Sequence, residues 1–250
     1  MKKTIIDLRI NEAIYADGSV LLKAVPAEGK LPETMPGQFV QLCSKTAFLR
    51  RPISIHDVEG EQISFLIQIV GEGTRWFQTL KAGDLLNAVM PLGRGFTLSE
   101  AGERVLLVGG GVGVAPLLYL GRVLKAKGVK PVFLLGARTG DALLRLDAFR
   151  AVGDVHVTTE DGSLGERGFV TDHSILTQEQ FTLIQTCGPT PMMKAIGRYA
   201  QAHNIRCEVS LENRMACGIG ACLCCVEDTV EGHKCVCTDG PVFDITDLKM

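Results

Sequence analysis

The pattern of apolar and polar residues divides the chain into two regions with different periods. Up to about residue 95, short apolar or alternating runs recur between turn signals such as Glu28-Gly29 and Pro36-Gly37. The runs are TIIDLRI, SVLLKAV, GQFVQLC, PISIHDV, QISFLIQIV and LLNAVM. Because about six short strands at this spacing are typical of a small closed sheet, the pattern predicts an antiparallel β-barrel. One short helix is predicted within it, over residues 74–80.

The period changes after residues 97–102, TLSEAG, which are predicted to form a linker. Buried apolar strands then alternate with helical segments, as they do in a parallel sheet with crossover helices. Strands are predicted over residues 104–108, 132–135, 154–158, 182–186 and 205–210, and helices over 114–127, 141–150 and 192–204. The predicted fold class is therefore a β-barrel followed by a Rossmann-like α/β domain.

Six of the nine cysteines lie in the short stretch from Cys217 to Cys237. Cys217, Cys222 and Cys225 have the spacing C-x4-C-x2-C, which is typical of plant-type [2Fe–2S] sites whose fourth cysteine comes from further along the chain. The spacing predicts a small C-terminal iron–sulfur domain. From spacing alone, Cys235 and Cys237 both remain candidates for the fourth ligand.

A structural zinc site is the main alternative for this loop. Such sites usually show paired C-x2-C units, whereas the first gap here is four residues, and Cys224 beside Cys225 adds another thiol. Disulfides would require an oxidising compartment, and an odd cysteine count clustered at one end favours a reducing cytosol. Gly218 and Gly220 would let the loop curl around a cluster, because glycine tolerates positive φ.

The predicted barrel carries two candidate phosphate-binding motifs. In the segment 50–55, RRPISI, the Arg51 guanidinium can fork onto phosphate oxygens, and the Ser54 hydroxyl can reach a ring nitrogen. In the segment 71–74, GEGT, Thr74 is predicted as the N-cap of a helix whose free N–H groups would bind an anion. Each motif alone is also compatible with an ordinary edge strand or turn.

A glycine-rich loop follows the first strand of the α/β region and precedes its first helix. Strand, glycine loop and helix is the setting that a dinucleotide fingerprint requires. The loop contains Gly109, Gly110, Gly111 and Gly113. Its match to G-x-G-x-x-G is imperfect, because Val114 or Pro116 stands at the third position. A merely tight turn is the alternative.

Ligand sites in such sheets lie at the carboxyl ends of the strands. That edge is predicted to collect the glycine loop, Arg138, the segment 161–163 and the tripeptide Cys187-Gly188-Pro189. Cys187 is expected to be a small buried residue rather than a reactive thiol. No acidic residue directly ends the second strand, so the choice between NAD and NADP stays open.

Composition excludes several classes of function. A formal net charge of −2 and the lack of a basic stripe exclude a nucleic-acid-binding protein. No uncharged apolar run reaches the ~18 residues of a membrane span, and the N-terminal sequence does not read as a signal peptide. A cytoplasmic protein is expected. No acid–base pair for catalysis is evident.

Taken in order, the motifs RPIS, GEGT, the glycine loop, CGP and C-x4-C-x2-C resemble those of the ferredoxin–NADP reductase superfamily. The segments LENRMACGIGACLCC and CTDGPVF are similar to those of the electron-transfer subunits of B-type dihydroorotate dehydrogenases. The resemblance spans essentially the whole chain. It implies FAD on the barrel, NAD on the α/β domain and one [2Fe–2S] cluster at the C-terminus.

The resemblance also implies roles for individual residues. The flavin motif is matched by Arg51, Pro52, Ile53 and Ser54, the flavin-lining strand by Ile67, Gln68 and Ile69, and the pyrophosphate turn by Gly73 and Thr74. The cluster ligands are implied to be Cys217, Cys222, Cys225 and Cys237, since the family's fourth cysteine precedes a DGP-like turn, here residues 239–241.

The implied partner is an FMN-containing catalytic subunit that oxidises dihydroorotate to orotate in pyrimidine biosynthesis, in a heterotetramer of two plus two. Electrons would pass from that FMN through the cluster and FAD to NAD⁺. The implied domains are residues 1–98, 99–208 and 209–250. Met215, Ile219 and Leu223 would either contact the partner or pack around the cluster.

Two alternatives are kept. One is a related diaphorase subunit that serves a hydrogenase, a glutamate synthase-like enzyme or a ferredoxin, with the same order of motifs. The other is a zinc-stabilised binding module without enzymatic activity, which would leave both phosphate-binding motifs without a purpose.

Overall fold

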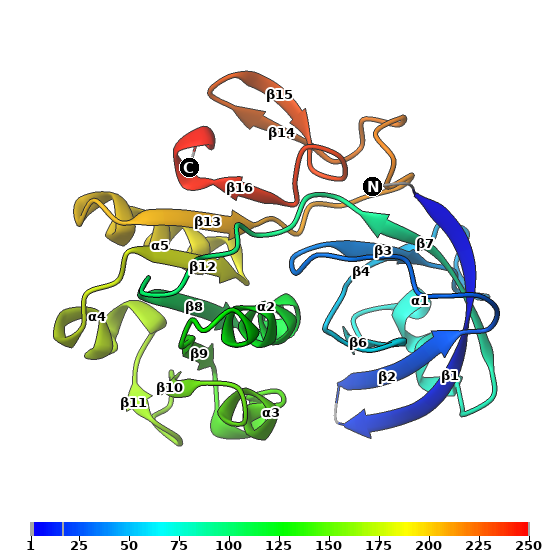
Figure 1. Cartoon of the computed structure of the whole chain (residues 1–250), viewed down its shortest axis with the longest axis horizontal. Helices are drawn as coiled ribbons and strands as arrows, with labels where there is room; N and C mark the ends of the chain where they lie inside the picture. The colour runs from blue at the N-terminus through cyan, green and yellow to red at the C-terminus, as the bar shows by residue number, and fades with distance from the viewer. Residues whose placement is uncertain (1–2, 17, 250) are drawn as a thin grey trace. The chain divides into compact units, whose positions relative to one another are not determined.

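The computed structural model describes residues 3–16 and 18–249 (Figure 1). Two compact units share these residues. The first contains the chain up to Gly95 together with residues 213–227 and 233–241. The second contains Phe96–Glu212 together with residues 228–232 and 242 onward. Each unit is therefore assembled from segments that are far apart in the sequence.

An antiparallel sheet forms most of the first unit. Its strands are β1 (Thr4–Ala16), β2 (Ser19–Pro26), β3 (Phe39–Leu42), β4 (Arg51–Ser54), β5 (Asp57–Glu59), β6 (Gln62–Gln68) and β7 (Leu85–Leu92). They are paired in the order β4-β3-β7-β1-β2-β6-β5, and β4 also contacts β6, so the sheet curls on itself. Leu8, Val20 and Phe65 are fully buried inside it. The predicted antiparallel barrel is confirmed as this curled sheet.

The run PISIHDV, expected as one strand, is divided between two strands. Its first part is β4 and its last part is β5, because the chain changes hydrogen-bonding partner between them. The N–H of Ile55 donates to the carbonyl of Gln38 beside β3, whereas the N–H of His56 donates to the carbonyl of Ser64 in β6.

The helix expected over residues 74–80 begins earlier and consists of two short turns. They are α1 (Glu72–Arg75) and the 3₁₀ turn η1 (Trp76–Thr79). The prediction of Thr74 as N-cap is wrong, since Gly71 occupies that position. Thr74 lies three residues further on, and its hydroxyl accepts from the N–H groups of Val70 (2.9 Å) and Gly71 (3.1 Å).

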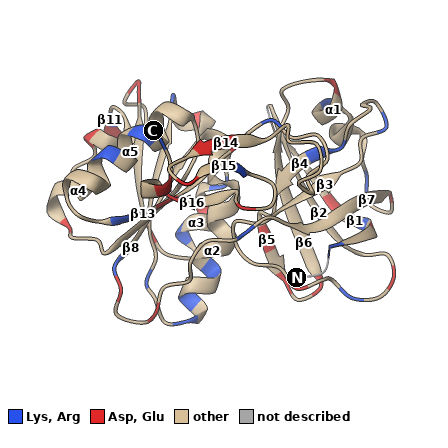
Figure 2. Ribbon diagram, turned by 90° about the horizontal axis from the view of Figure 1, so that it is seen from above, with Lys and Arg blue, Asp and Glu red and all other residues tan. Residues whose placement is uncertain are grey.

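A mostly parallel sheet forms the centre of the second unit. Its strands are β8 (Val105–Gly110), β9 (Val132–Ala137), β10 (Asp154–Thr159), β11 (Glu166–Arg167), β12 (Leu183–Cys187), β13 (Arg206–Ser210) and β16 (Val242–Asp244). They are paired in the order β11-β10-β9-β8-β12-β13-β16, and β16 runs antiparallel to β13. The predicted Rossmann-like sheet is confirmed. Figure 2 shows helices α2 (Ala115–Ala126) and α3 (Leu146–Arg150) on one face and α5 (Thr190–Ala202) on the other.

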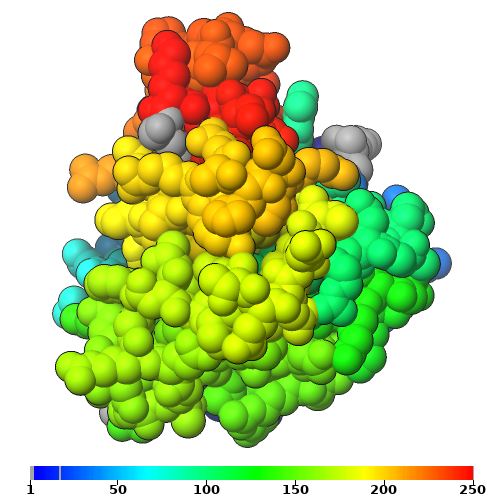
Figure 3. Space-filling view, turned by 90° about the vertical axis from the view of Figure 1, so that its left-hand side faces the viewer, coloured from blue at the N-terminus to red at the C-terminus, as the bar shows by residue number. Residues whose placement is uncertain are grey.

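Two parts of this unit differ from the prediction. The helix expected over 141–150 is only α3, because Arg145 adopts a left-handed φ of 60° and separates it from the 3₁₀ turn η3 (Gly140–Ala142). The antiparallel strand β16 was not expected. Figure 3 shows the C-terminal residues in red against the gold-coloured residues of α5 and β13, in line with this pairing.

The remaining described elements are short. They are the 3₁₀ turns η2 (Gly111–Val114), η4 (Val170–Asp172) and η5 (Ile245–Asp247), the helix α4 (Ile175–Gln178), and the hairpin strands β14 (Val226–Thr229) and β15 (Gly232–Cys235). The hairpin interrupts the cysteine-rich segment, so Cys225 precedes its first strand and Cys237 follows its second.

Candidate functional site

The two glycine-containing loops of the α/β unit meet at the carboxyl ends of β8 and β12. The register of these parallel strands places Cys187 opposite Gly109. A Cβ atom on Gly113 would lie 2.6 Å from the carbonyl oxygen of Cys187, and one on Gly188 would lie 3.0 Å from the backbone nitrogen of Gly110. Such separations are too short for any side chain, so the loops pack backbone against backbone.

The next strands bring further polar groups to the same edge of the sheet. The segment 161–163 follows β10, and its Ser163 hydroxyl accepts from the N–H of Gly140, which follows β9 (2.8 Å). Ser163 also donates to the Asp161 carboxylate (2.6 Å), and this hydrogen bond lowers the pKa of Asp161. The N–H of Asp161 donates to the carbonyl of Arg138, so these predicted residues are brought together.

Cys187 lies at the end of β12 and is buried. Burial raises the pKa of its thiol, and the nearby Glu212 raises it further. The thiol donates toward the Glu212 carboxylate at an S···O distance of 3.7 Å. The thiol therefore stays protonated at neutral pH, which confirms the expectation of a buried residue rather than a reactive thiolate.

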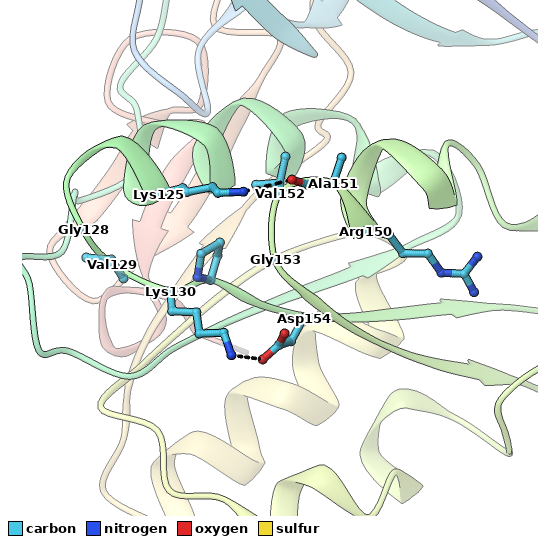
Figure 4. Close-up of a pocket in the computed structure, with 10 residues that line it drawn as sticks. Lys125, Gly128, Val129, Lys130, Arg150, Ala151, Val152, Gly153 and Asp154 are labelled. Carbon is cyan, nitrogen blue, oxygen red and sulfur yellow. Dashed lines mark hydrogen bonds and ion pairs between the residues drawn. The ribbon is translucent and has the colours of Figure 1, made fainter.

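A separate pocket of about 420 Å³ lies at the opposite, amino-terminal edge of the same sheet (Figure 4). It contains three basic residues, and each is engaged within the protein. Lys130 pairs with Asp154 at 2.7 Å, Lys125 donates to the carbonyl of Ala151 at 3.0 Å, and Arg150 pairs with Asp147 at 3.4 Å. Ligands of open α/β sheets bind at the carboxyl edge, so this pocket is not the candidate site.

The two motifs of the curled sheet also meet. The Arg51 guanidinium lies against the backbone of Gly73, where a Cβ atom would be 2.9 Å from the guanidinium carbon. The preceding Arg50 has a different role, because its guanidinium donates to the carbonyls of Gln41 and Asn87 at 3.2 Å and ties β3 to β7. Of the two adjacent arginines, Arg51 is therefore the one placed at the glycine turn.

The other predicted residues of this unit lie close by in the chain. Pro52, Ile53 and Ser54 are half-buried in β4. Ile67 is buried near the end of β6, Gln68 is exposed and Ile69 is half-buried just beyond it. The structure thus places a buried, an exposed and a half-buried residue in the segment that was expected to line the flavin.

The cysteine loop brings its thiols together as two pairs. Cys222 lies close enough to Cys217 to lower the pKa of the Cys217 thiol by hydrogen bonding. The N–H of Cys237 donates to the sulfur of Cys225 (3.4 Å), and the Cys225 side chain raises the pKa of the Cys237 thiol. No set of three His, Cys, Asp or Glu side chains within residues 3–16 and 18–249 converges as ligands of a single ion. A [2Fe–2S] cluster takes two protein ligands on each iron, and two neighbouring pairs match that requirement.

Backbone N–H groups point at these sulfurs. The N–H of Gly220 donates to the sulfur of Cys237 (3.2 Å), and that of Ile219 donates to the sulfur of Cys217 (3.4 Å). Burial would raise the pKa of Cys217, but N–H groups including those of Ile219 and Cys222 lower it to about 6. Gly218 and Gly220 have φ values of 70° and 86°, so the loop uses glycine where the chain curls.

The remaining cysteines of the loop are placed differently. Cys235 ends β15, and its N–H donates to the Asp239 carboxylate (2.8 Å) while its carbonyl accepts from the N–H of Asp239. Cys224 is exposed, whereas the adjacent Cys225 is buried. Of the apolar residues between the cysteines, Ile219 and Leu223 are exposed and Met215 is half-buried.

Two residues beside these sites were not predicted from the sequence. Glu212 contacts the thiol of Cys187, and nothing in the sequence around it indicates this. Gln41 is completely buried in β3. A polar residue within the apolar run FVQL was a usable signal, because a buried amide requires hydrogen-bonding partners.

Among the described residues, no helix combines the length and the apolar character that crossing a bilayer demands.

Comparisons with known proteins agree with this geometry. Residues 212–249 match the family model for the iron–sulfur cluster binding domain of dihydroorotate dehydrogenase B, and residues 107–198 match that for an oxidoreductase NAD-binding domain. The first match covers the cysteine loop, and the second covers the glycine loop and Cys187–Pro189.

Several curated relatives match most of the chain. The electron transfer subunit of dihydroorotate dehydrogenase B (NAD⁺) from Caldanaerobacter subterraneus is 44% identical over 86% of this chain and 87% of its own length. Those from Shouchella clausii and Bacillus cereus are 42% and 43% identical over 88% of this chain and 90% of their own lengths.

Solved structures resemble the whole fold. An NADH-dependent reduced ferredoxin–NADP oxidoreductase, described for flavin-based electron bifurcation, has a TM-score of 0.86 and 30% identity. That match covers 97% of this chain and 89% of the other. A cytochrome P450 reductase from Amycolatopsis has a TM-score of 0.72 at 22% identity, over 81% of this chain and 67% of the other, and shows a shared fold.

Proposed function

We propose that this chain, which belongs to the family of dihydroorotate dehydrogenase B electron transfer subunits, passes electrons from the FMN of a catalytic partner subunit to NAD⁺. The route would lead through a [2Fe–2S] cluster and FAD, and the pathway served would be pyrimidine biosynthesis. The observation that carries the proposal is the pairing of Cys217 with Cys222 and of Cys225 with Cys237 in the segment matched as an iron–sulfur domain.

The bound groups supply the electron chemistry, since a cluster carries single electrons, a nicotinamide takes a hydride, and a flavin exchanges either. The chain's own residues bind these groups and place them. No general acid or base is required of the chain, which agrees with the lack of an evident acid–base pair in its sequence.

Arg51 and Gly73 would hold the pyrophosphate of FAD. Their contact places a planar, fork-shaped donor beside a backbone without a side chain, and this combination suits phosphate oxygens. Thr74 would support the turn rather than cap the helix, because its hydroxyl fixes the N–H groups of Val70 and Gly71. Pro52, Ile53 and Ser54 would bind the flavin, with Ile67, Gln68 and Ile69 along it.

The surface that the loops 109–113 and 187–189 form at the carboxyl edge of the sheet would hold NAD. Gly109, Gly110, Gly111 and Gly113 would leave the backbone free to approach the dinucleotide, as glycines do in such loops. The buried thiol of Cys187, which contacts Glu212, would lie beneath this surface. Gly188 and Pro189 complete the loop that faces Gly113.

Cys217, Cys222, Cys225 and Cys237 would be the cluster ligands. The thiol of Cys237 contacts that of Cys225 and accepts a hydrogen bond from Gly220. The backbone of Cys235 is instead engaged with Asp239. These contacts support Cys237 over Cys235. Cys222 and Cys224 are both exposed, so Cys224 is left outside the ligand set because it belongs to neither pair.

A catalytic partner subunit with FMN would complete the enzyme, in an assembly of two subunits of each kind. The exposed Ile219 and Leu223 would face that partner. We further propose a cytoplasmic protein with three functional domains, residues 1–98, 99–208 and 209–250. The nine cysteines are all free, which supports a reducing compartment.

One observation favours a second function, a reductase subunit that exchanges electrons with ferredoxin. The ferredoxin–NADP oxidoreductase structure matches nearly the whole chain. The dihydroorotate dehydrogenase relatives are more similar, however, at 42–44% identity against 30%, so we rank this function second.

Reconstitution tests the two functions directly. The purified chain is mixed with an FMN-containing dihydroorotate dehydrogenase catalytic subunit, and NADH formation is followed with dihydroorotate as the electron donor. We expect NADH only when both subunits are present. NADH formed with reduced ferredoxin, and none with dihydroorotate and the catalytic subunit, would support the second function instead.

A further inference from the structure

Gln41 is a buried amide without a partner in the described part of the chain. It lies in the middle of β3 with 0% of its surface exposed. Neither its side-chain oxygen nor its side-chain nitrogen has a hydrogen-bonding partner there. A buried amide left unpaired destabilises the folded chain, and buried polar side chains of native proteins rarely remain so. A partner outside the polypeptide is therefore expected.

The side chain of Gln41 ends at the cysteine loop. A Cβ atom on Gly218 would lie 2.9 Å from the amide nitrogen of Gln41 and 2.7 Å from its Cγ. Gly218 directly follows the proposed ligand Cys217 and has a φ of 70°. Any side chain at position 218 would therefore displace the amide, and glycine keeps the amide beside the loop.

The backbone of Gln41 belongs to the proposed flavin site. In the β3–β4 pairing Gln41 stands opposite Pro52. Residues directly opposite one another share a face of the sheet, and Ser54 shares that face because it lies two residues from Pro52. Gln41 thus connects the strand of the RPIS motif with the cysteine loop, and both belong to the same compact unit.

We propose that the side-chain amide of Gln41 donates a hydrogen bond to a sulfur of the [2Fe–2S] cluster and thereby sets the cluster's reduction potential. The inference rests on the proposed function. Sulfide and thiolate sulfurs only accept hydrogen bonds, so the amide nitrogen is the atom that can serve them. One-electron reduction adds negative charge to the sulfurs without breaking a bond in the chain. A donor stabilises that charge, and hydrogen bonds to sulfur are among the factors that set cluster potentials.

The proposal makes Gln41 a positioning and tuning residue rather than a ligand. Gln41 also pairs with Pro52 in β4, the strand of the proposed flavin motif. It would therefore set the potential of the cluster where the two proposed cofactor sites adjoin. A more positive cluster potential favours acceptance of electrons from the partner subunit. Loss of the donor should therefore make the cluster harder to reduce without removing it.

The test is a redox titration of the full-length, cofactor-loaded protein, with the EPR signal of the reduced cluster as the readout. Gln41→Met keeps the length of the side chain and removes both N–H donors. Loss of one hydrogen bond to a charged acceptor changes an equilibrium about tenfold. For a one-electron couple, this corresponds to a midpoint potential about 59 mV more negative. Gln41→Glu, which places a carboxylate beside the cluster, should shift the midpoint further in the same direction.

Gln185→Met is the matched control. Gln185 is also fully buried within a strand, but its amide nitrogen already donates to the carbonyl of Thr97 (2.8 Å) and to Glu208 (2.7 Å). Its replacement should lower stability and leave the cluster potential unchanged. Loss of the cluster from Gln41→Met alone, with Gln185→Met loaded, would contradict a tuning role and overturn the proposal.

An unchanged midpoint in Gln41→Met, or an equal shift in Gln185→Met, overturns the proposal. A wild-type protein that contains no cluster would overturn the proposed function together with this inference. A wild-type protein that contains the cluster, together with an unchanged midpoint potential in Gln41→Met, would overturn this inference alone.

Discussion

The loop pair 109–113 and 187–189 and the cysteine loop, residues 217–237, are held in place in different ways. Regular strands fix the loop pair, since the parallel pairing of β8 with β12 places Gly109 opposite Cys187. The cysteine loop has no such frame, and its thiols are positioned by glycines with positive φ and by N–H groups that point at sulfur. Packing within a sheet therefore fixes the first region, whereas local turns and hydrogen bonds to sulfur fix the second.

This difference has a consequence for stability and function. A change in the loop pair acts on the packing of a sheet and should disturb the fold as well as ligand binding. A change in the cysteine loop should remove one bound group and leave the rest of the chain working.

The largest effect is expected from Cys222→Ser. The variant should lose the cluster, because a serine hydroxyl is a poor substitute for a thiolate ligand. Electron transfer from dihydroorotate to NAD⁺ in the reconstituted enzyme should fall to background, while reduction of an artificial acceptor by NADH should remain. Iron content and both activities are measured. Full dihydroorotate:NAD activity without the cluster would refute the relay.

Gly113→Ala should have the next largest effect, and it should alter stability and NADH binding rather than the cluster. An added methyl group would press on the carbonyl of Cys187 at 2.6 Å, and overpacking of this sort costs about 1–3 kcal/mol. We expect a lower midpoint of thermal unfolding and a raised KM for NADH, with iron content unchanged. Gly111→Ala is the companion variant. A Cβ atom on Gly111 would meet no atom within 4 Å, although the φ of Gly111 is 55°. If both variants bind NADH as the wild type does, the loop pair is not the nucleotide site.

Arg51→Lys should have an intermediate effect, because it retains the charge and removes the fork-shaped pair of donors. Hydrogen bonds to charged groups contribute about 1.5–3 kcal/mol, so FAD affinity should fall about tenfold or more. Equilibrium dialysis with FAD measures it. Unaltered FAD affinity would remove Arg51 from the pyrophosphate site.

Cys224→Ser should have the smallest effect. Its thiol is exposed and belongs to neither pair, although it is adjacent to Cys225. Iron content, cluster spectrum and activity should all match the wild type, which makes it the control for Cys222→Ser. A lost cluster here would mean that the ligand set differs from the one proposed.

Periodic segments were predictable from the sequence, and contacts between distant segments were not. The helix after the glycine loop was expected over 114–127 and is α2, Ala115–Ala126, because its apolar period and glycine-rich start are local signals. The expected helix over 141–150 was too long, since the left-handed turn at Arg145 has no strong sequence signal. Strand β16 was missed because three residues carry too little pattern to identify.

The same distinction between local signals and distant contacts applies to the candidate sites. The motifs RPIS, GEGT and C-x4-C-x2-C could be read from spacing, but the contact of Arg51 with Gly73 depends on how the sheet curls. The contact of Gln41 with Gly218 joins residues 177 positions apart (218 minus 41). Only a folded chain shows such a contact.

The most direct test of the central claim is the absorption spectrum of the anaerobically purified protein, recorded before and after addition of NADH. The account predicts flavin and iron–sulfur bands that are both bleached by NADH in the wild type, and flavin bands alone in Cys222→Ser. A colourless wild-type protein with bound zinc, or a cluster that NADH leaves oxidised, would contradict it.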